Sequence, residues 1–206
     1  MLDKTLNIRG TLTSLATPLV MGILNITPDS FYAGSRKQTE TAIEDRIREI
    51  LSEGGDWIDI GGYSSRPDPA EVTPEEEMRR LEFALHILNK HYPDIPVSVD
   101  TFRAGIARRC VEEYGAAIIN DISGGELDAD MFQTVADLKV PYIMMHMRGT
   151  PQTRQRHTDY PDMMEEIMLY FSRKVCQLRL LGVNDIILDP GFGFSKTLEQ
   201  NYQLMS

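Results

Sequence analysis

The sequence has few of the features that mark a secreted, membrane-bound or nucleic-acid-binding protein. Its 2 cysteines, Cys110 and Cys176, have no metal-ligand spacing, and we interpret both as small buried side chains. It has no membrane-length apolar run and no basic-then-apolar N-terminus. Its formal net charge of -10, without a basic patch, argues against binding nucleic acid or an anionic membrane. We therefore expect a cytoplasmic protein.

What the sequence does contain is a repeated unit: a short apolar segment of strand length that ends in polar residues. The 206 residues can bury the core of one domain. The segments are not alternating in polarity, which favours parallel strands covered by helices. Strands are predicted at residues 19–24, 57–60, 96–99, 116–119, 142–145 and 185–188. Residues 4–16 alternate around Gly10 and predict a β-hairpin before the first of these strands.

Helix signals lie between the strands. Thr73 is predicted as an N-cap with Pro74 at the first helical position, and Glu76 as the partner that closes a capping box. Later in the chain, a longer helix is predicted to align its buried face along Met164, Ile167, Phe171, Val175 and Leu178.

Six strand-then-helix units fit either a doubly wound sheet or a (β/α)8 barrel. No Gly-x-Gly-x-x-Gly follows the first strand, which counts against a dinucleotide-binding sheet. We favour the barrel, with about six of its eight βα units present. Because such a barrel typically takes about 250 residues, we expect residues 1–206 to form a single barrel domain that is incomplete at its C-terminus.

In a barrel the carboxyl ends of all strands meet at one face. The polar residues expected there are Asn25, Ser65, Arg66, Asp100, Asn120, His146 and Asp189. Carboxylates accept paired hydrogen bonds, so Asp100 and Asp189 with Asn120 suit a planar heterocycle that carries a ring N–H beside an amino group. The alternative for each Asp is a helix N-cap.

The remaining candidates have other roles. Ser65 and Arg66 follow a glycine pair and resemble an anion or phosphate contact, the alternative being a solvated turn. Asn25 offers a neutral oxygen to Mg2+. His146 has no second metal ligand at a suitable spacing, which favours a structural histidine. Phe192 and Phe194 could stack on a flat ligand or simply pack the top of the barrel.

Six motifs in the chain together resemble bacterial dihydropteroate synthase. They are Gly22-Ile-Leu-Asn-Ile-Thr-Pro-Asp-Ser-Phe31, Asp59-Ile-Gly-Gly-Tyr-Ser-Ser-Arg-Pro67, Ser98-Val-Asp-Thr101, Ile119-Asn-Asp-Ile122, Met145-His-Met147 and Asp189-Pro-Gly-Phe-Gly-Phe-Ser-Lys-Thr197. The resemblance implies a (β/α)8 barrel and a transferase of folate biosynthesis. That enzyme joins 6-hydroxymethyl-7,8-dihydropterin diphosphate to p-aminobenzoate, releases diphosphate, and is the sulfonamide target.

The resemblance also implies roles for individual residues. Asn25 would hold Mg2+ and the diphosphate, and Asp100, Asn120 and Asp189 would bind the pterin. The first mobile loop would contain Thr27, Asp29 and Phe31, and the second, near the diphosphate and p-aminobenzoate, Ser65 and Arg66. Asp100 and Asp189 would stabilise a cationic pterin methylene, with Arg66 as the third catalytic residue. No protein nucleophile is required, in keeping with the absence of a Ser-His or Cys-His pair in the sequence.

The chain departs from the family pattern in a few places. Tyr63 stands where many members have Glu, and Ser65 where many have Thr. The family's Ser-Arg-Lys and Arg-x-His stretches have no counterpart, nor do the late helices that build its homodimer, so the dimer is not carried over to this chain. Two alternatives stay open: a non-catalytic pterin-binding fragment and a pterin-dependent methyltransferase. The methyltransferase would not need the Thr-Pro-Asp-Ser-Phe segment.

Overall fold

The computed structural model describes residues 4–26, 36–63, 72–150, 153 and 157–206. Six parallel strands form one sheet: β3 (Met21–Asn25), β4 (Trp57–Gly61), β5 (Val97–Asp100), β6 (Ile118–Asp121), β7 (Tyr142–Met145) and β8 (Ile186–Asp189). Their spatial order is their order in the chain. A doubly wound sheet would reverse direction at a switch point, whereas strictly sequential parallel strands are the arrangement of a (β/α)8 barrel. The predicted barrel topology is confirmed.

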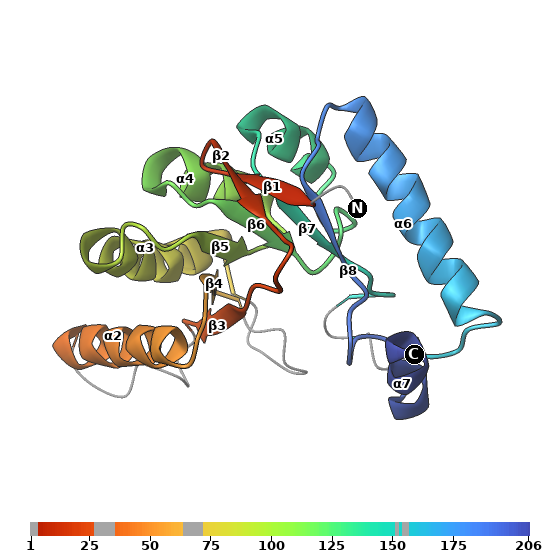
Figure 1. Cartoon of the computed structure of the whole chain (residues 1–206), viewed down its shortest axis with the longest axis horizontal. Helices are drawn as coiled ribbons and strands as arrows, with labels where there is room; N and C mark the ends of the chain where they lie inside the picture. The colour runs from red at the N-terminus through yellow and green to blue at the C-terminus, as the bar shows by residue number, and fades with distance from the viewer. Residues whose placement is uncertain (1–3, 27–35, 64–71, 151–152, 154–156) are drawn as a thin grey trace.

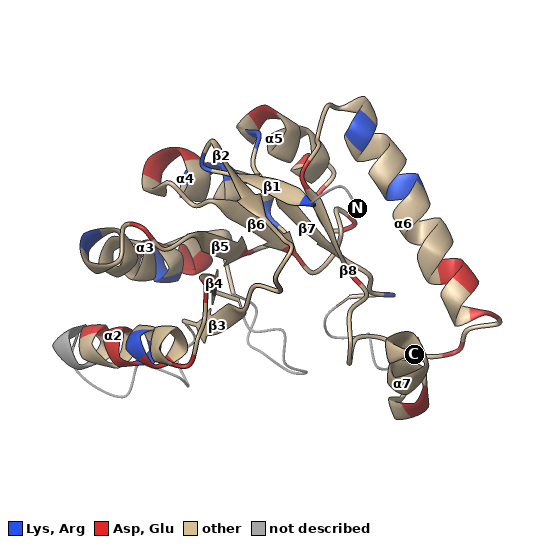
Figure 2. Cartoon of the chain, viewed as in Figure 1, with Lys and Arg blue, Asp and Glu red and all other residues tan. Residues whose placement is uncertain are grey.

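The helices lie on the outer side of this sheet, and Figure 1 shows α2 to α6 in an arc around the strands. Their bounds are α2 (Arg36–Ser52), α3 (Pro74–His91), α4 (Ala104–Tyr114), α5 (Met131–Leu138), α6 (Met163–Leu180) and α7 (Leu198–Met205). Charged residues gather on the helices, while the strands are mostly uncharged (Figure 2). The core between the layers is aliphatic, with Leu24, Ile58, Leu81 and Ile119 fully buried. Among the described helices, none combines the length and apolarity that crossing a bilayer requires.

The predicted N-terminus of α3 is confirmed in part. The Thr73 side chain accepts a hydrogen bond from the Glu76 backbone N–H, and Pro74 opens the helix. Glu76 does not complete the predicted capping box, because its carboxylate binds Arg79 and Arg80 on the next turn instead. A complete capping box occurs where none was predicted, at the start of α7 between Thr197 and Gln200.

The predicted hairpin is confirmed as β1 (Thr5–Ile8) and β2 (Thr11–Ser14). Its two-residue turn has positive φ at both Arg9 (50°) and Gly10 (81°), the geometry that favours glycine and suits tight hairpins. Arg9 is held in this conformation by its guanidinium, which donates to the carbonyls of Pro93 (2.9 Å) and Gly115 (3.1 Å). The hairpin therefore covers the amino-terminal end of the sheet.

Two packing predictions are wrong. Cys176 is exposed, whereas Cys110 is buried as predicted. On the same helix, α6, the buried face begins at Met163 and continues through Ile167 and Phe171, so Met164 lies 39% exposed. The periodicity of α6 is as predicted, but its phase at the first turn is one residue earlier, because spacing by four from Phe171 through Ile167 reaches Met163.

The packing of the hairpin against the sheet predicts that two of its apolar residues contribute very differently to stability. Ile8 is 5% exposed and belongs to a buried cluster that contains Trp57, Ile118 and Ile143. Ile8→Ala should lower the free energy of unfolding by about 2–4 kcal/mol, since a buried cavity replaces the side chain. Leu12→Ala is the matched control, because Leu12 is 72% exposed, and should change stability by less than about 0.5 kcal/mol. Urea unfolding of both variants measures the difference, and equal effects would contradict the hairpin's packing.

Candidate active site

A row of residues at the carboxyl ends of four neighbouring strands forms the base of the candidate site. Asn25 on β3 pairs in register with Gly61 on β4, which pairs with Asp100 on β5, and Asp100 pairs with Asn120 on β6. In-register residues of parallel strands point to the same side of the sheet. The register thus brings three predicted site residues, Asn25, Asp100 and Asn120, into one row around a glycine.

Gly61 leaves the space into which its neighbours' side chains project. A Cβ at this position would lie 3.1 Å from Asn25 Oδ1 and 3.5 Å from Asp100 Oδ2. Even a methyl group here would press on the Asn25 amide and come into contact with the Asp100 carboxylate. Close approach of this kind is a common reason for glycine in the interior of a strand.

Asp59 is a buried carboxylate that sequence reasoning did not place in the site. It lies two residues before Gly61 on β4, on the same face of the sheet, and is 5% exposed. Its Oδ2 accepts a hydrogen bond from Asn120 Nδ2 at 3.0 Å, while its buried Oδ1 has no partner among the described residues. The available signal was a charged residue inside the otherwise apolar strand Trp57–Gly61.

Asp59 and Asp100 place two carboxyl groups near one another in the interior of the site. Burial raises the pKa of Asp59 to about 6, although hydrogen bonding to the carboxylate works in the opposite direction. Burial also raises the pKa of Asp100 well above its ordinary value, and the nearby charges of Asp59, Asp121 and Glu77 add to that rise. Such a pair is stabilised by a ligand that donates hydrogen bonds or carries positive charge.

Asp189 lies farther along the same face. Asn120 is in register with Ile143 on β7 and Ile143 with Ile187 on β8, so Asp189 is two residues nearer the carboxyl end. Its Oδ1 accepts from the Gly191 backbone N–H at 2.8 Å, a turn-forming contact that Asp often makes. Because of this offset, the Asp189 carboxylate lies beyond the row of Asn25, Asp100 and Asn120, on the side of the carboxyl ends of the strands.

An apolar surface lies beside these polar groups. Ile122, Met145 and Met147 are buried together, and the partly buried rings of Phe102 and Phe194 pack against them. Four of them occur at or within two residues of the ends of β5 to β7, and Phe194 lies in the loop after β8. A flat heterocycle with polar edges matches a site that has an apolar wall and a few oriented polar groups.

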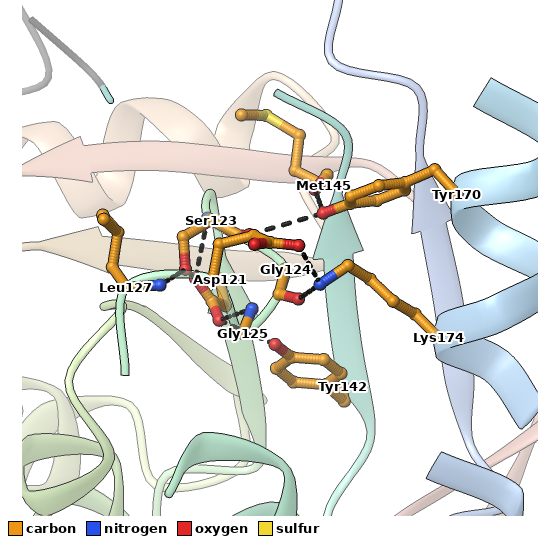
Figure 3. Close-up of polar contacts among 10 residues, drawn as sticks. Asp121, Ser123, Gly124, Gly125, Leu127, Tyr142, Met145, Tyr170 and Lys174 are labelled. Carbon is orange, nitrogen blue, oxygen red and sulfur yellow. Dashed lines mark hydrogen bonds and ion pairs between the residues drawn. The ribbon is translucent and has the colours of Figure 1, made fainter. Parts of the chain in front are cut away.

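Asp121 fixes the loop that follows Asn120 (Figure 3). The carboxylate is fully buried and accepts hydrogen bonds from Ser123 N, Ser123 Oγ, Gly125 N and Tyr142 Oη, at 2.7–2.8 Å. From α6, Lys174 donates to the Gly124 carbonyl at 2.7 Å. The loop is therefore held from both the sheet and a covering helix.

Helix α3 supports the ends of β4 and β5, the strands before and after it in the chain. Glu77 is fully buried, accepts from Thr101 Oγ1 at 2.7 Å and forms an ion pair with Arg103. Arg80 donates to the Gly62 carbonyl at 3.0 Å. These contacts hold the residues directly after Gly61 and Asp100, and no sequence motif indicated them, because each joins groups distant in the chain.

His146 is buried at the end of β7, where its ring packs edge-on against Tyr170 with centroids 4.9 Å apart. This is the packing role predicted for it. In the described part of the chain, the ligand atoms close enough to share an ion belong to Glu40, Glu44 and His91 instead.

The structure brings Asn25, Asp100, Asn120 and Asp189 to one face, as predicted. The other predicted site residues, Thr27, Asp29, Phe31, Ser65 and Arg66, lie outside the described residues. Of the two candidate stacking rings, Phe194 joins the apolar wall and Phe192 is 46% exposed.

Comparison with known proteins identifies the class to which this site belongs. A profile of the family described as pterin binding enzyme matches residues 21–206. The chain therefore belongs to the pterin binding enzyme family.

The relatives within that family are named more specifically. A dihydropteroate synthase of Synechocystis is 43% identical over 188 residues, which cover 90% of this chain and 64% of the relative. A folic acid synthesis protein of Pneumocystis carinii is 44% identical over 193 residues, 92% of this chain and 26% of that protein. The crystal structure of a Yersinia pestis dihydropteroate synthase with a sulfonamide drug has a TM-score of 0.86 and 36% identity, covering 98% of this chain and 73% of that one. The chain thus spans a quarter to two thirds of these two curated relatives.

The raised pKa of Asp59 predicts a gain in stability when the charge is removed. Between its ordinary pKa, near 4, and about 6, the folded protein holds a proton that the unfolded chain releases, so this group's contribution to stability falls as pH rises. Asp59→Asn keeps an oxygen to accept from Asn120. At pH 7.5 it should raise the free energy of unfolding by roughly 2 kcal/mol, and at pH 4 by much less.

Denaturant unfolding at the two pH values tests this, with exposed Asp94→Asn as the control that should be neutral at both. A loss of stability in Asp59→Asn at pH 7.5 would contradict the assignment of a destabilising buried charge.

The hydrogen bonds to Asp121 predict that two substitutions destabilise the fold by different amounts. Asp121→Asn replaces one acceptor oxygen with a donor that faces other donors, and should destabilise the fold by about 2–3 kcal/mol. Tyr142→Phe removes one hydrogen bond and should cost about 1 kcal/mol. Thermal unfolding distinguishes the two, and the reverse ranking would show that Asp121 is not the centre of the network.

Proposed function

We propose that this chain carries the pterin site of a dihydropteroate synthase. The enzyme joins 6-hydroxymethyl-7,8-dihydropterin diphosphate to p-aminobenzoate and releases diphosphate. The observation that carries the proposal is the row of Asn25, Asp100 and Asn120, with Asp59 beneath it and an apolar wall beside it. The names of the family and of its synthase relatives support the same conclusion.

The pterin ring would use both parts of the site. Its ring N–H and exocyclic amino group would donate to the carboxylates of Asp100 and Asp189, and its remaining edge would meet the amide of Asn120. Its faces would pack against the wall that contains Met145 and Phe194. Because two donors favour an ionised carboxylate, pterin binding should lower the raised pKa of Asp100 and release a proton.

The carboxylates at the strand ends also suit the chemical step. The bond between the pterin methylene and the diphosphate oxygen breaks, and its electron pair leaves with the diphosphate. The methylene and the conjugated ring then carry positive charge, which Asp100 and Asp189 would stabilise from fixed positions in a site of low dielectric. The arylamine nitrogen forms the new C–N bond and loses a proton. Exclusion of water by the two predicted loops would protect the cation, with Arg66 as their predicted cationic contact.

Asn25 is the residue that would hold Mg2+. Its amide oxygen is a hard neutral donor, it is exposed at the end of β3, and it projects over Gly61 beside the acidic interior. One protein oxygen, with water and phosphate oxygens completing the shell, is a typical Mg2+ arrangement. When bound, the ion would offset the charge of the departing diphosphate.

The partners that follow from this proposal are small molecules. They are the dihydropterin diphosphate, p-aminobenzoate, and sulfonamides as inhibitors, since the Yersinia pestis relative was solved with such a drug. Because the dihydropterin diphosphate is a charged, water-soluble molecule, we propose that the reaction takes place in the cytoplasm.

Replacing Asp100 should separate pterin binding from folding. Asp100→Asn should weaken the binding of 6-hydroxymethylpterin by about 10- to 100-fold, since it removes charge-assisted hydrogen bonds worth about 1.5–3 kcal/mol. Calorimetry on the wild type, on Asp100→Asn and on exposed Asp94→Asn measures this, and Asp94→Asn should bind as the wild type does. Equal affinities in all three would reject Asp100 as a pterin ligand.

A second assay decides what the site does. Diphosphate release from the dihydropterin diphosphate should require Mg2+ and p-aminobenzoate, and should fall sharply in Asn25→Ala. Pterin binding without release would favour the non-catalytic reading of the chain. Methyl transfer from methyltetrahydrofolate should be absent, and its presence would favour the methyltransferase.

A further inference from the structure

Lys196 is a buried lysine that the proposed reaction does not use. It ends the loop that leaves β8, and only 8% of it is exposed. Its Nζ lies 2.9 Å from the Phe194 carbonyl, 3.1 Å from the Gly191 carbonyl and 3.2 Å from His146 Nδ1. An ammonium group has three N–H donors and no acceptor. The three contacts therefore account for every hydrogen of a protonated Lys196.

His146 is suited to be the third acceptor. Burial lowers its pKa to about 4, and the charges of Lys196 and Arg148 add to the effect. The ring is thus neutral at physiological pH, and a neutral imidazole has one nitrogen that can accept. Because the rings of Tyr170 and Phe171 pack against the imidazole, its orientation toward Lys196 is fixed by the core.

The contacts of Lys196 lead directly to the candidate site. Gly191 accepts from Lys196 through its carbonyl and donates through its N–H to Asp189 Oδ1, at 2.8 Å. It has a φ of 70°, and a Cβ there would lie 2.2 Å from the His146 carbonyl oxygen. The other carbonyl that Lys196 holds belongs to Phe194, whose ring joins the apolar wall. One ammonium therefore joins a polar and an apolar element of the site.

We propose that Lys196 is a positioning residue for pterin binding: its ammonium shapes the loop so that Asp189 and Phe194 face the ligand together. This inference rests on the proposed function. Lys196 does not contact the ligand. It acts through Gly191, Phe194 and His146, and the charge is essential because a neutral amine offers only two hydrogens to three acceptors.

The surroundings of Lys196 predict that its effect on pterin binding depends on pH. Burial lowers the pKa of Lys196 to about 8, although the charge of Asp189 raises it. The charged or titratable groups around it are Asp189 from β8, His146 from β7 and Arg148 from the loop after β7. Lys196 is thus the group in this cluster whose charge changes between pH 7 and pH 9.5.

The test compares Lys196→Met with the wild type across this range, using 6-hydroxymethylpterin and calorimetry on the full chain. At pH 7 the variant should bind about tenfold more weakly. At pH 9.5 the ratio of the two dissociation constants should shrink toward one, because the wild type has lost the same charge. Any titration of the ligand itself cancels in this ratio. Exposed Lys90→Met is the matched control, with a ratio near one throughout.

Each outcome has one meaning. A ratio above one that does not change with pH would show a merely structural lysine and overturn the inference, as would a ratio of one at pH 7. If the wild type does not bind the pterin at all, the proposed function fails first and the inference falls with it. If Lys196→Met does not fold, Lys196→Arg replaces it, because a planar guanidinium keeps the charge but cannot reach three converging acceptors. The same decline in the ratio is then expected.

Discussion

The register of the parallel strands is the constraint on which the site depends. Asn25, Gly61, Asp100 and Asn120 form one row only because β3, β4, β5 and β6 pair without a shift between them. A slip of one residue in any strand would turn its polar side chain from the interior to the helix layer, since successive side chains point to opposite faces. The apolar residues between the strands and helices oppose such a slip, because it would remove them from their contacts with the helices. Hydrophobic packing and the position of the polar groups are thus determined together.

The same register creates an electrostatic cost. Burial disfavours the ionisation of both Asp59 and Asp100, and the charge of Asp59 adds to this effect at Asp100, so these two groups reduce the stability of the fold. Active sites are commonly places where stability is given up for function. Here the cost has a chemical use, since a cavity that already favours positive charge needs no rearrangement when a cation forms.

The loops around the site are held by elements outside it. Glu77 and Arg80 on α3 fix the residues after β4 and β5, and Lys174 on α6 holds the loop after β6. Lys196 likewise holds the loop after β8, although it belongs to that loop itself. Displacing one of these loops would be costly, because it would leave a buried charge without its partners.

Much of this protein was determined by its sequence alone. Apolar segments of strand length, each followed by a helical period, were enough to locate all six strands, because burial imposes local patterns that neighbouring residues share. The polar residues that end these apolar segments predicted four site residues, Asn25, Asp100, Asn120 and Asp189. This prediction was possible because the change from apolar to polar residues is also a local pattern. The long motifs then indicated the family.

Tertiary structure decided what depends on contacts between distant residues. Asp59 became part of the site because Asn120, 61 residues later, donates to it. Lys196 acquired its third partner, His146, only when the end of β7 met the loop after β8. The failed capping box at Glu76 and the exposed Cys176 show the same limit on a smaller scale. A local pattern states which partners a side chain could have, but the fold determines which of them it meets.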